Sequence, residues 1–326
     1  MSECGSAPIF HSPIGSLMTQ FIREKQACGY SYHTGSGALR RFDRFLADQG
    51  LTEVALPRDL VEQWIAKQPN ESVTTHQARI GLTRRLAVFV ASQGAPAYLP
   101  PAHLGARGRS RFVPRIFSHD EIRRLFAAAD GLQPSGHAPL RYLILPELLR
   151  VLYGCGLRVS EALHLRVADV ALESGVLTIR QTKFQKDRLV PMTSALTQRL
   201  QRYAHMARVQ HTDGLFFPAP HTGVYHHSSI YKAFRSLLWD CRIPHGGRGH
   251  GPRLHDLRHT YAVHRLAKWY REGADLQAKL PILAAYMGHF SMNETQEYLQ
   301  LTAEVFPELS TRCETAFGHL IPRSSR

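Results

Sequence analysis

Prolines and glycines interrupt the chain between residues 95 and 116 and divide it into two parts. The interrupting residues are Pro96, Pro100, Pro101, Gly105, Gly108 and Pro114. Proline cannot continue a helix and glycine weakens one, so their clustering indicates a connecting segment. The chain has 326 residues and 44% apolar content, enough for one large domain or two ordinary domains with cores of their own. We therefore expect a domain at 1–95, a basic linker at 96–117 and a second domain at 118–326.

The first part has the apolar spacing of helices. Between residues 13 and 94, apolar side chains recur every three to four positions, and no strand-like alternation interrupts them. The first stretch places Ile14 and Phe21 inward and ends near Gly29, and three similar stretches follow before Gly94. We predict a small all-α domain of four helices.

The second part mixes helical periodicity with one short hairpin. Ser118 and Glu121 have the spacing of a capping box at the start of a helix. The expected elements are helices at 118–130 and about 139–155, strands at 175–180 and 188–191, and further helices beyond Ser194. The predicted fold is mainly α with a small β-sheet, an all-α domain followed by an α+β domain.

Charge points to a polyanionic partner. The chain holds 40 Lys and Arg against 26 Asp and Glu, a net charge of +14 and a pI near 9.9. Such an excess favours nucleic acid, although a basic protein without that partner is the plainer alternative.

The cysteines and the apolar runs argue against several classes of protein. Five cysteines lie far apart without a CxxC pair, which argues against a disulfide framework or a cysteine zinc site and fits a reducing cytoplasm. No apolar run has the length of a membrane span, and the first residues lack the features of a signal peptide. We expect a cytoplasmic protein without a membrane partner.

Arg158 and Lys183 are candidates for binding phosphate. Arg158 follows a glycine break, and Glu161 lies three residues on, on the same helical face, where it could orient the guanidinium. An ordinary surface ion pair is the alternative. Lys183 lies in the predicted hairpin turn near Lys186 and Arg188, where three cations favour phosphate contact unless this is a routine basic turn.

The segment from His255 to His259 has two chemical interpretations. Helical spacing brings His255 and Arg258 to one face, where both could meet one phosphate. The alternative is a metal site, because two histidines four residues apart with an acidic residue second imitate a zinc motif. Arg258 opposes this, since its charge repels a cation. For His259 a packing or capping role is the simpler interpretation.

Tyr298 follows His289 by nine residues and is a candidate nucleophile. A phenol has a pKa of about 10, but neighbouring cations favour the phenolate and a histidine can accept the proton. A tyrosine taken alone is more often a core residue.

Five segments in this order resemble the tyrosine recombinase family, also called phage integrases, which includes the bacterial Xer-type enzymes. The matching segments are Gly156–Glu161, Thr182–Pro191, His255–Thr260, Met287–His289 and Thr295–Tyr298. The resemblance covers the whole chain. It implies that residues 1–95 are a core-binding (SAM-like) domain that binds DNA and that residues 118–326 are a catalytic domain with a C-terminal tail.

The resemblance also implies a role for each candidate. Tyr298 attacks the scissile phosphate to form a 3′-phosphotyrosyl link, while Arg158 and Arg258 bind the non-bridging oxygens. Lys183 is the general acid for the 5′-hydroxyl. The supporting residues are His255 as proton acceptor and donor, His289 as a hydrogen-bonding partner of the phosphate or the tyrosine, and Glu161. No cofactor and no metal are implied.

The implied function is site-specific DNA recombination or integration for a phage, a transposon, another mobile element or a chromosome-dimer system. A type IB-like topoisomerase and a catalytically silent DNA-binding regulator are the alternatives. The implied partners are double-stranded DNA, a homotetramer assembled on two DNA sites, and related recombinases or accessory DNA-bending proteins. In that tetramer the tail at 299–326 docks on a neighbouring protomer. The implied location is the bacterial cytoplasm, on the nucleoid.

Overall fold

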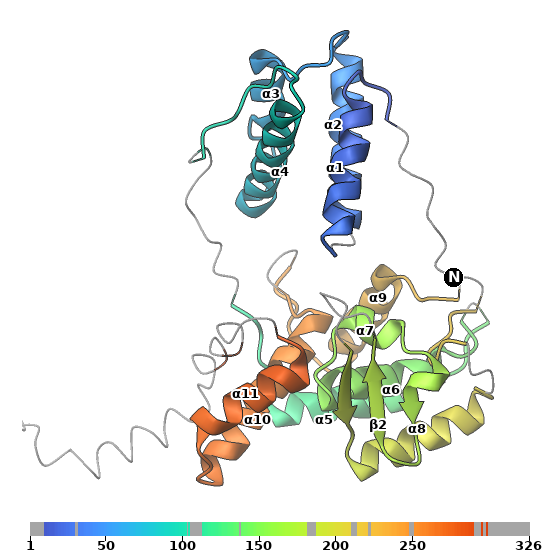
Figure 1. The fold of residues 1–326 in the computed structure, drawn as a ribbon. Helices are drawn as coiled ribbons and strands as arrows, with labels where there is room; N and C mark the ends of the chain where they lie inside the picture. Colours follow the sequence, from blue (N-terminus) through green and yellow to red (C-terminus); the bar gives the residue numbers. More distant parts are fainter. Residues whose placement is uncertain are drawn as a thin grey trace, which may run out of the picture. The chain divides into compact units, whose positions relative to one another are not determined.

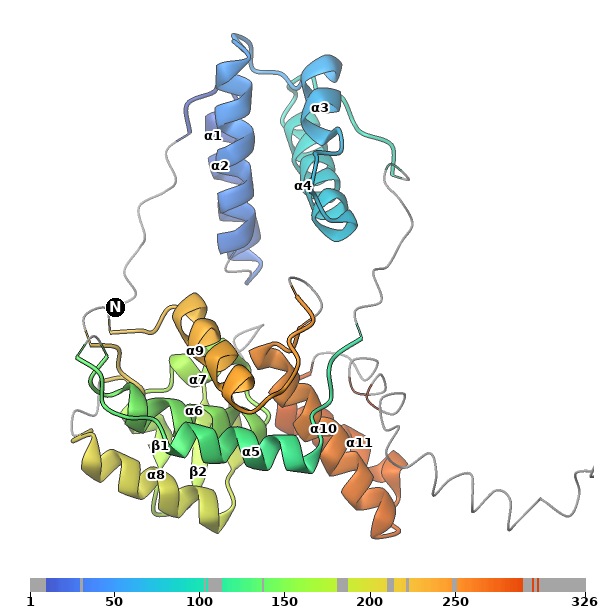
Figure 2. The ribbon, with the colours of Figure 1, turned by 180° about the vertical axis from the view of Figure 1, so that it is seen from behind.

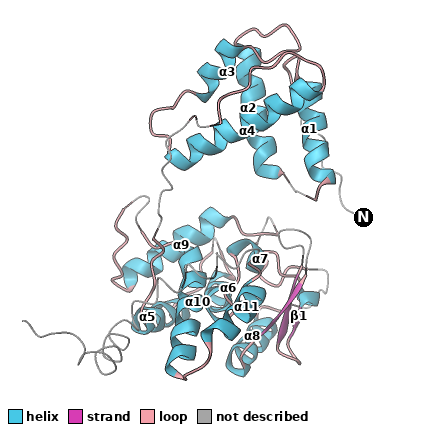
Figure 3. Ribbon diagram, turned by 60° about the vertical axis from the view of Figure 1, so that its left-hand side comes forward, coloured by secondary structure: helices cyan, strands magenta, loops and turns pink. Residues whose placement is uncertain are grey.

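The computed structural model divides the chain into two compact units, Met1–Phe112 and Val113–Arg326. The structure describes residues 10–29, 32–102, 104, 113–136, 138–180, 187–209, 214–220, 223–247, 251–289, 295 and 298. Helices dominate both units and the strands form one small sheet (Figure 3). The predicted fold class, mainly α with a small sheet, is confirmed.

The described part of the first unit contains four helices. They are α1 (Gly15–Ala27), α2 (His33–Asp48), α3 (Arg58–Ile65) and α4 (Val73–Ser92). Their apolar stripes meet in one core, in which Met18, Phe42 and Leu86 are at most 2% exposed. Ser72 caps α4 by accepting a hydrogen bond from the backbone N–H of Thr75 at 3.1 Å. The four helices predicted from the periodicity are confirmed.

The described elements of the second unit surround one central helix. They are α5 (His119–Asp130), α6 (Arg141–Gly154), α7 (Val159–Leu163), a 3₁₀ turn (Val167–Asp169), β1 (Val170–Ala171), β2 (Val176–Ile179), β3 (Arg188–Pro191), α8 (Ser194–Met206), α9 (His227–Asp240), α10 (Leu254–Arg271) and α11 (Leu276–Met287). Helix α6 packs against α5, α8 and α10 (Figure 1). Its side chains are buried on several faces, as an apolar helix with neighbours all round requires.

The sheet is antiparallel, with the strand order β1-β2-β3. Leu177 of β2 pairs with Val190 of β3, and both side chains are fully buried while their sequence neighbours face the other side. The sheet therefore fixes the position of Arg188, the first residue of β3. The two-residue strand β1 was not predicted, because it is too short to show an alternating pattern.

The ends of the helices follow the expected local chemistry. Ser118 and Glu121 form the predicted capping box, with Ser118 Oγ accepting from Glu121 N–H at 3.1 Å and Glu121 accepting from Ser118 N–H at 3.0 Å. Helix α11 ends at Gly288, which has φ +68°, the left-handed conformation common after helices. Helices α10 and α11 lie side by side in both views (Figures 1 and 2). In the described ranges, no helix has both the length and the apolar character needed to cross a membrane.

Candidate active site

Arg158 lies at the start of α7, immediately after the glycine break that ends α6. Gly156 has φ +59°, and a Cβ there would lie 2.6 Å from the ring of Tyr261, so only glycine fits. The backbone N–H and Nη1 of Arg158 both donate to Glu161, each at 2.8 Å. Glu161 thus caps α7 and holds the guanidinium, which is the contact expected from their three-residue spacing.

Arg188 is a second partner of Glu161 that the sequence interpretation missed. Its Nη1 and Nη2 donate to the two Glu161 carboxylate oxygens at 3.0 and 2.8 Å, and its Nε donates to the Tyr286 carbonyl at 3.0 Å. The sequence grouped Arg188 with the basic turn as a phosphate contact, whereas the structure uses it to hold Glu161. No sequence signal marks this pair, because Glu161 and Arg188 are 27 residues apart and meet only through the fold.

The electrostatics of Glu161 reflect this pairing. Its side chain is 9% exposed, and burial alone would raise the carboxyl pKa. The hydrogen bonds and charge of Arg188, followed by those of Arg158, outweigh burial and lower the pKa of Glu161 to about 2. Glu161 is therefore a fixed anion between two cations.

Arg258 is a buried cation anchored by backbone carbonyls. It lies on α10 with 1% of its surface exposed, and its Nη1 and Nη2 donate to the carbonyls of Gly156 and Met287 at 2.5 and 2.8 Å. Burial, followed by the charge of Arg158, lowers the pKa of Arg258 to about 10. The guanidinium stays charged at neutral pH in a place poor in water.

The end of α11 holds the two predicted arginines together. Arg158 Nη2 donates to the Gly288 carbonyl at 3.0 Å, next along the chain from the Met287 carbonyl that binds Arg258. Helix C-termini carry partial negative charge on such carbonyls, which favours cations there. A Cβ at Gly288 would lie 2.7 Å from Arg188 Nη1, so all three arginines crowd this turn.

Tyr298 is buried among histidines. It is 4% exposed, and its hydroxyl lies 3.1 Å from Nδ1 of His259. The ring of His289 stacks on the Tyr298 ring with 5.7 Å between centroids, while its Nδ1 bonds to Thr295 Oγ1 at 2.7 Å. The ring of His255 stands at 88° to that of His259, with centroids 4.6 Å apart.

This arrangement differs from the sequence interpretation of His259. His259, interpreted as a packing or capping residue, contacts the tyrosine hydroxyl. His289, expected to bond to the phosphate or to Tyr298, contacts the tyrosine through its ring face. Only their places in the fold reveal this, because His259 is four residues from His255 on α10 and 39 residues from Tyr298 in sequence.

The three histidines are neutral at physiological pH. Burial is the largest cause for each, and the charge of Arg258 contributes to all three. The pKa falls to about 4 for His255 and to about 3 for both His259 and His289. Each neutral ring therefore has one nitrogen that can accept a hydrogen bond.

Lys183 and the tail at 299–326 lie outside the residues that the structure describes. Within the described ranges, no three His, Cys, Asp or Glu side chains gather as a metal site. Asp256, the acidic residue of the suspected zinc motif, is fully buried and accepts hydrogen bonds from the backbone and side chain of Arg253. Asp256 therefore caps the start of α10.

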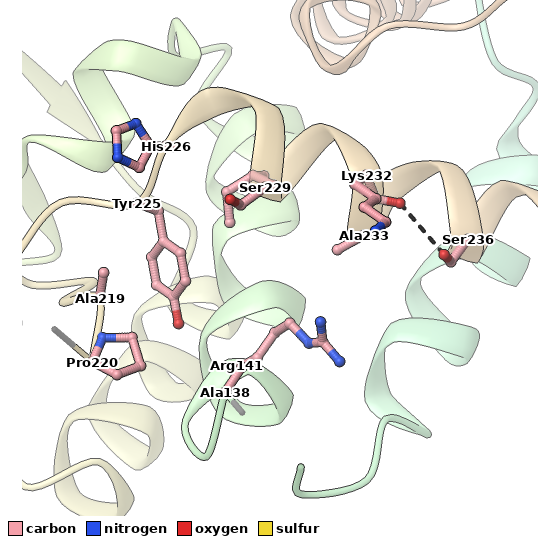
Figure 4. A pocket seen from close by; sticks show the side chains of 11 residues that line it. Ala138, Arg141, Ala219, Pro220, Tyr225, His226, Ser229, Lys232, Ala233 and Ser236 are labelled. Carbon is pink, nitrogen blue, oxygen red and sulfur yellow. Dashed lines mark hydrogen bonds between the residues drawn. The ribbon is translucent and has the colours of Figure 1, made fainter. Parts of the chain in front are cut away.

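A cavity of about 430 Å³ lies elsewhere in the second unit, between the start of α6 and α9. The side chains of Arg141 and Tyr225 reach into it (Figure 4). None of its lining residues belongs to the cluster around Tyr298, so it is a separate feature.

Comparison with known proteins supplies the family. The model described as "Phage integrase family" matches residues 115–304. The putative integrase/recombinase y4rB of Sinorhizobium fredii is 31% identical over 315 residues, covering 93% of this chain and 98% of that protein. Tyrosine recombinase XerD of Neisseria meningitidis serogroup B is 31% identical over 232 residues, 68% of this chain and 71% of that protein.

A solved structure agrees in fold. The Tn1549 transposon integrase, in complex with a circular intermediate DNA, has a TM-score of 0.61 at 15% identity, covering 88% of this chain and 95% of that one. The family match over residues 115–304 and the recombinase relatives place the chain among the DNA strand-transferring enzymes. The chain belongs to the phage integrase family, the tyrosine recombinases, and its activity is site-specific DNA recombination. The topoisomerase and silent-regulator alternatives are not favoured.

Proposed function

We propose that Tyr298 is the nucleophile and that Arg158 and Arg258 hold the scissile phosphate. The observation that carries this proposal is the burial of the Tyr298 hydroxyl against His259, on the same helix that carries Arg258. A tyrosine with a purely packing role has no need of a hydroxyl held by a neutral histidine beside a buried arginine.

The two arginines are suited to bind the five-coordinate phosphate of the transition state. Their guanidinium groups are fixed by the adjacent carbonyls of Met287 and Gly288, and the Arg158 side chain remains 29% exposed. Guanidinium groups bind phosphate oxygens through paired N–H donors. Preorganised donors of this kind are worth about 3–4 kcal/mol each where charge develops in a transition state.

The proposed reaction transfers the phosphate from DNA to Tyr298 and back. The phenolic oxygen attacks phosphorus, a 3′-phosphotyrosyl bond forms, and the 5′-oxygen leaves with a proton supplied by Lys183. A 5′-hydroxyl from a partner strand then attacks the phosphotyrosine and releases Tyr298. The covalent link conserves the energy of the phosphodiester, so neither ATP nor a metal is needed. His255 and His289 complete the site around the phosphate.

The test of the nucleophile is covalent capture on a nicked suicide substrate in the presence of EDTA. We expect the wild-type protein to form a denaturation-resistant DNA adduct and Tyr298→Phe to form none, with DNA affinity nearly unchanged. An adduct with Tyr298→Phe, or one that requires a divalent metal, would contradict the proposal. Peptide mapping of the wild-type adduct identifies the linked residue.

The biological setting is proposed from the relatives. Their names include integrases, a transposon integrase and Xer recombinases, which supports a role in the integration or transposition of a mobile element or in resolving chromosome dimers. We propose that four protomers act on two sites of double-stranded DNA in the bacterial cytoplasm, on the nucleoid. Residues 1–95 form the core-binding domain, the tail at 299–326 docks on a neighbouring protomer, and related recombinases or DNA-bending proteins assist.

A further inference from the structure

His259 is the histidine whose ring nitrogen meets the hydroxyl of Tyr298. The separation of 3.1 Å between Nδ1 and the phenolic oxygen is a hydrogen-bond distance, and the ring centroids lie 5.5 Å apart. The other two histidines are placed differently. His289 has its Nδ1 bonded to Thr295 and offers its ring face to Tyr298, and His255 packs against the ring of His259.

The surroundings keep the imidazole ring of His259 neutral. Burial, then the charges of His255, Arg253 and Arg258, lower the pKa of His259 to about 3. In the tautomer with its proton on Nε2, a neutral imidazole has a lone pair on Nδ1 that can accept a hydrogen bond from the phenol O–H. The groups that face this pair are His255, Arg253 and Arg258 on or next to α10, and His289 beyond the end of α11.

We propose that His259, in place of His255, accepts the proton of Tyr298 during cleavage and returns it during rejoining. This inference rests on the proposed role of Tyr298 as nucleophile. In cleavage, the O–H bond of Tyr298 breaks, its proton passes to Nδ1 of His259, and the phenolic oxygen bonds to phosphorus as the bond from phosphorus to the 5′-oxygen breaks. The 5′-oxygen takes its proton from the general acid assigned to Lys183. In rejoining, the His259 imidazolium protonates the departing phenolate.

The same geometry couples proton transfer to DNA binding. Besides burial, His255 and Arg253, the positive charge of Arg258 opposes protonation of His259, and a scissile phosphate held by Arg258 would bring negative charge beside it. The bound phosphate therefore makes His259 a stronger base, and the tyrosine stays a phenol until DNA is in place. This is a function for a residue whose sequence position, directly after Arg258, suggests only packing.

The experiment measures single-turnover adduct formation on the suicide substrate with His259→Ala and His259→Asn in the full-length protein. Asparagine presents a hydrogen-bonding group near the position of Nδ1 but cannot take a proton. We expect both variants to form the adduct at least 100-fold more slowly while DNA binding, measured by gel shift, changes less than threefold. Their rates should rise with pH more steeply than the wild-type rate, because hydroxide must replace the imidazole.

The matched control is His264→Asn. His264 lies five residues further along α10, and its Nδ1 is 2.8 Å from the hydroxyl of Tyr153, so the same kind of pair is broken away from Arg158, Arg188 and Arg258. We expect its cleavage rate to stay within threefold of wild type. If His264→Asn slows cleavage as much as His259→Asn, the effect reflects the integrity of α10 and the proposal is overturned.

A substrate with sulfur in place of the bridging 5′-oxygen separates the two proton transfers. A thiolate leaves without an acid, so this substrate should restore Lys183→Ala but leave the His259 variants slow. Three results would each overturn the inference. The sulfur substrate could restore the cleavage rate of His259→Ala, or His259→Asn could cleave ordinary DNA at the wild-type rate. The third is a His259→Ala rate within threefold of wild type. Failure of Tyr298→Phe to abolish the adduct would instead remove the nucleophile assignment, a distinct result.

Discussion

Glu161 binds Arg158 and Arg188 through its carboxylate. Loss of this carboxylate should lower the stability of the protein as well as its catalytic rate. The folded-state pKa of Glu161, about 2, lies below its unfolded-state pKa of about 4.3. The stabilisation from its carboxylate is therefore fully present above the unfolded-state pKa and is lost as the pH falls through the folded-state pKa. The shift corresponds to about 3 kcal/mol at neutral pH. We expect Glu161→Gln to lower the free energy of unfolding by about this amount at pH 7.

Urea unfolding between pH 7 and pH 3 measures this difference. The gap between wild type and Glu161→Gln should narrow steadily below about pH 5, because protonation of Glu161 removes the same charge. The control is Glu272→Gln, which breaks an exposed pair with Lys268 at 3.6 Å and should leave stability nearly unchanged. A gap of equal size at pH 3 and pH 7 would show that the carboxylate charge is not the cause.

Single residues were predicted from sequence where a short motif marks them. Arg158, Glu161, Arg258 and Tyr298 stand in segments whose spacing is informative. Arg188 and His259 were assigned other roles, because their partners come from elements distant in the chain. A carboxylate shared by two arginines, and a histidine facing a tyrosine, depend on tertiary placement that periodicity does not contain.

Three arginines, Arg158, Arg188 and Arg258, pack around the turn after α11 at Gly288. Gly288 has φ +68°, where a side chain costs about 1–2 kcal/mol, and a Cβ there would also press on Arg188. We expect Gly288→Ala to destabilise the protein by more than that backbone cost and to slow adduct formation at least tenfold. Denaturant unfolding and the suicide substrate measure the two effects.

Gly273 after α10 provides the matched control. It has φ +71°, and a Cβ there would have nothing within 4 Å. Gly273→Ala should therefore show the backbone cost alone, about 1–2 kcal/mol, with cleavage unchanged. Equal losses of stability and activity in the two variants would mean that the contact with Arg188 has no part in the site.

Helices were predictable because each carries its own periodic signal and its own end signals. The four helices of the first unit and the capping box at Ser118 are local features. The strand β1 and the convergence of α7, α10 and α11 on the arginines are not local. They depend on contacts between separate elements, namely β1 with β2, α7 and α10 with α6, and α11 with α10 and β3.

At the scale of the molecule, the charge of +14 should make DNA affinity steeply dependent on salt. Each phosphate neutralised by a cation releases counterions, so the logarithm of affinity falls linearly with the logarithm of salt, by about 0.9 per contact. The charge was readable from sequence, but which cations face DNA is a property of the assembled complex.

Affinity of the full-length protein for its DNA, measured from low to physiological KCl, tests how the proposed site contributes to that slope. Arg158→Ala should reduce the slope by about 1, because one phosphate contact is lost, and should abolish cleavage. Tyr298→Phe should keep the wild-type slope, since the hydroxyl carries no charge to exchange with counterions. A slope that Arg158→Ala leaves unchanged would place its guanidinium away from the phosphate and confine it to the ion pair with Glu161.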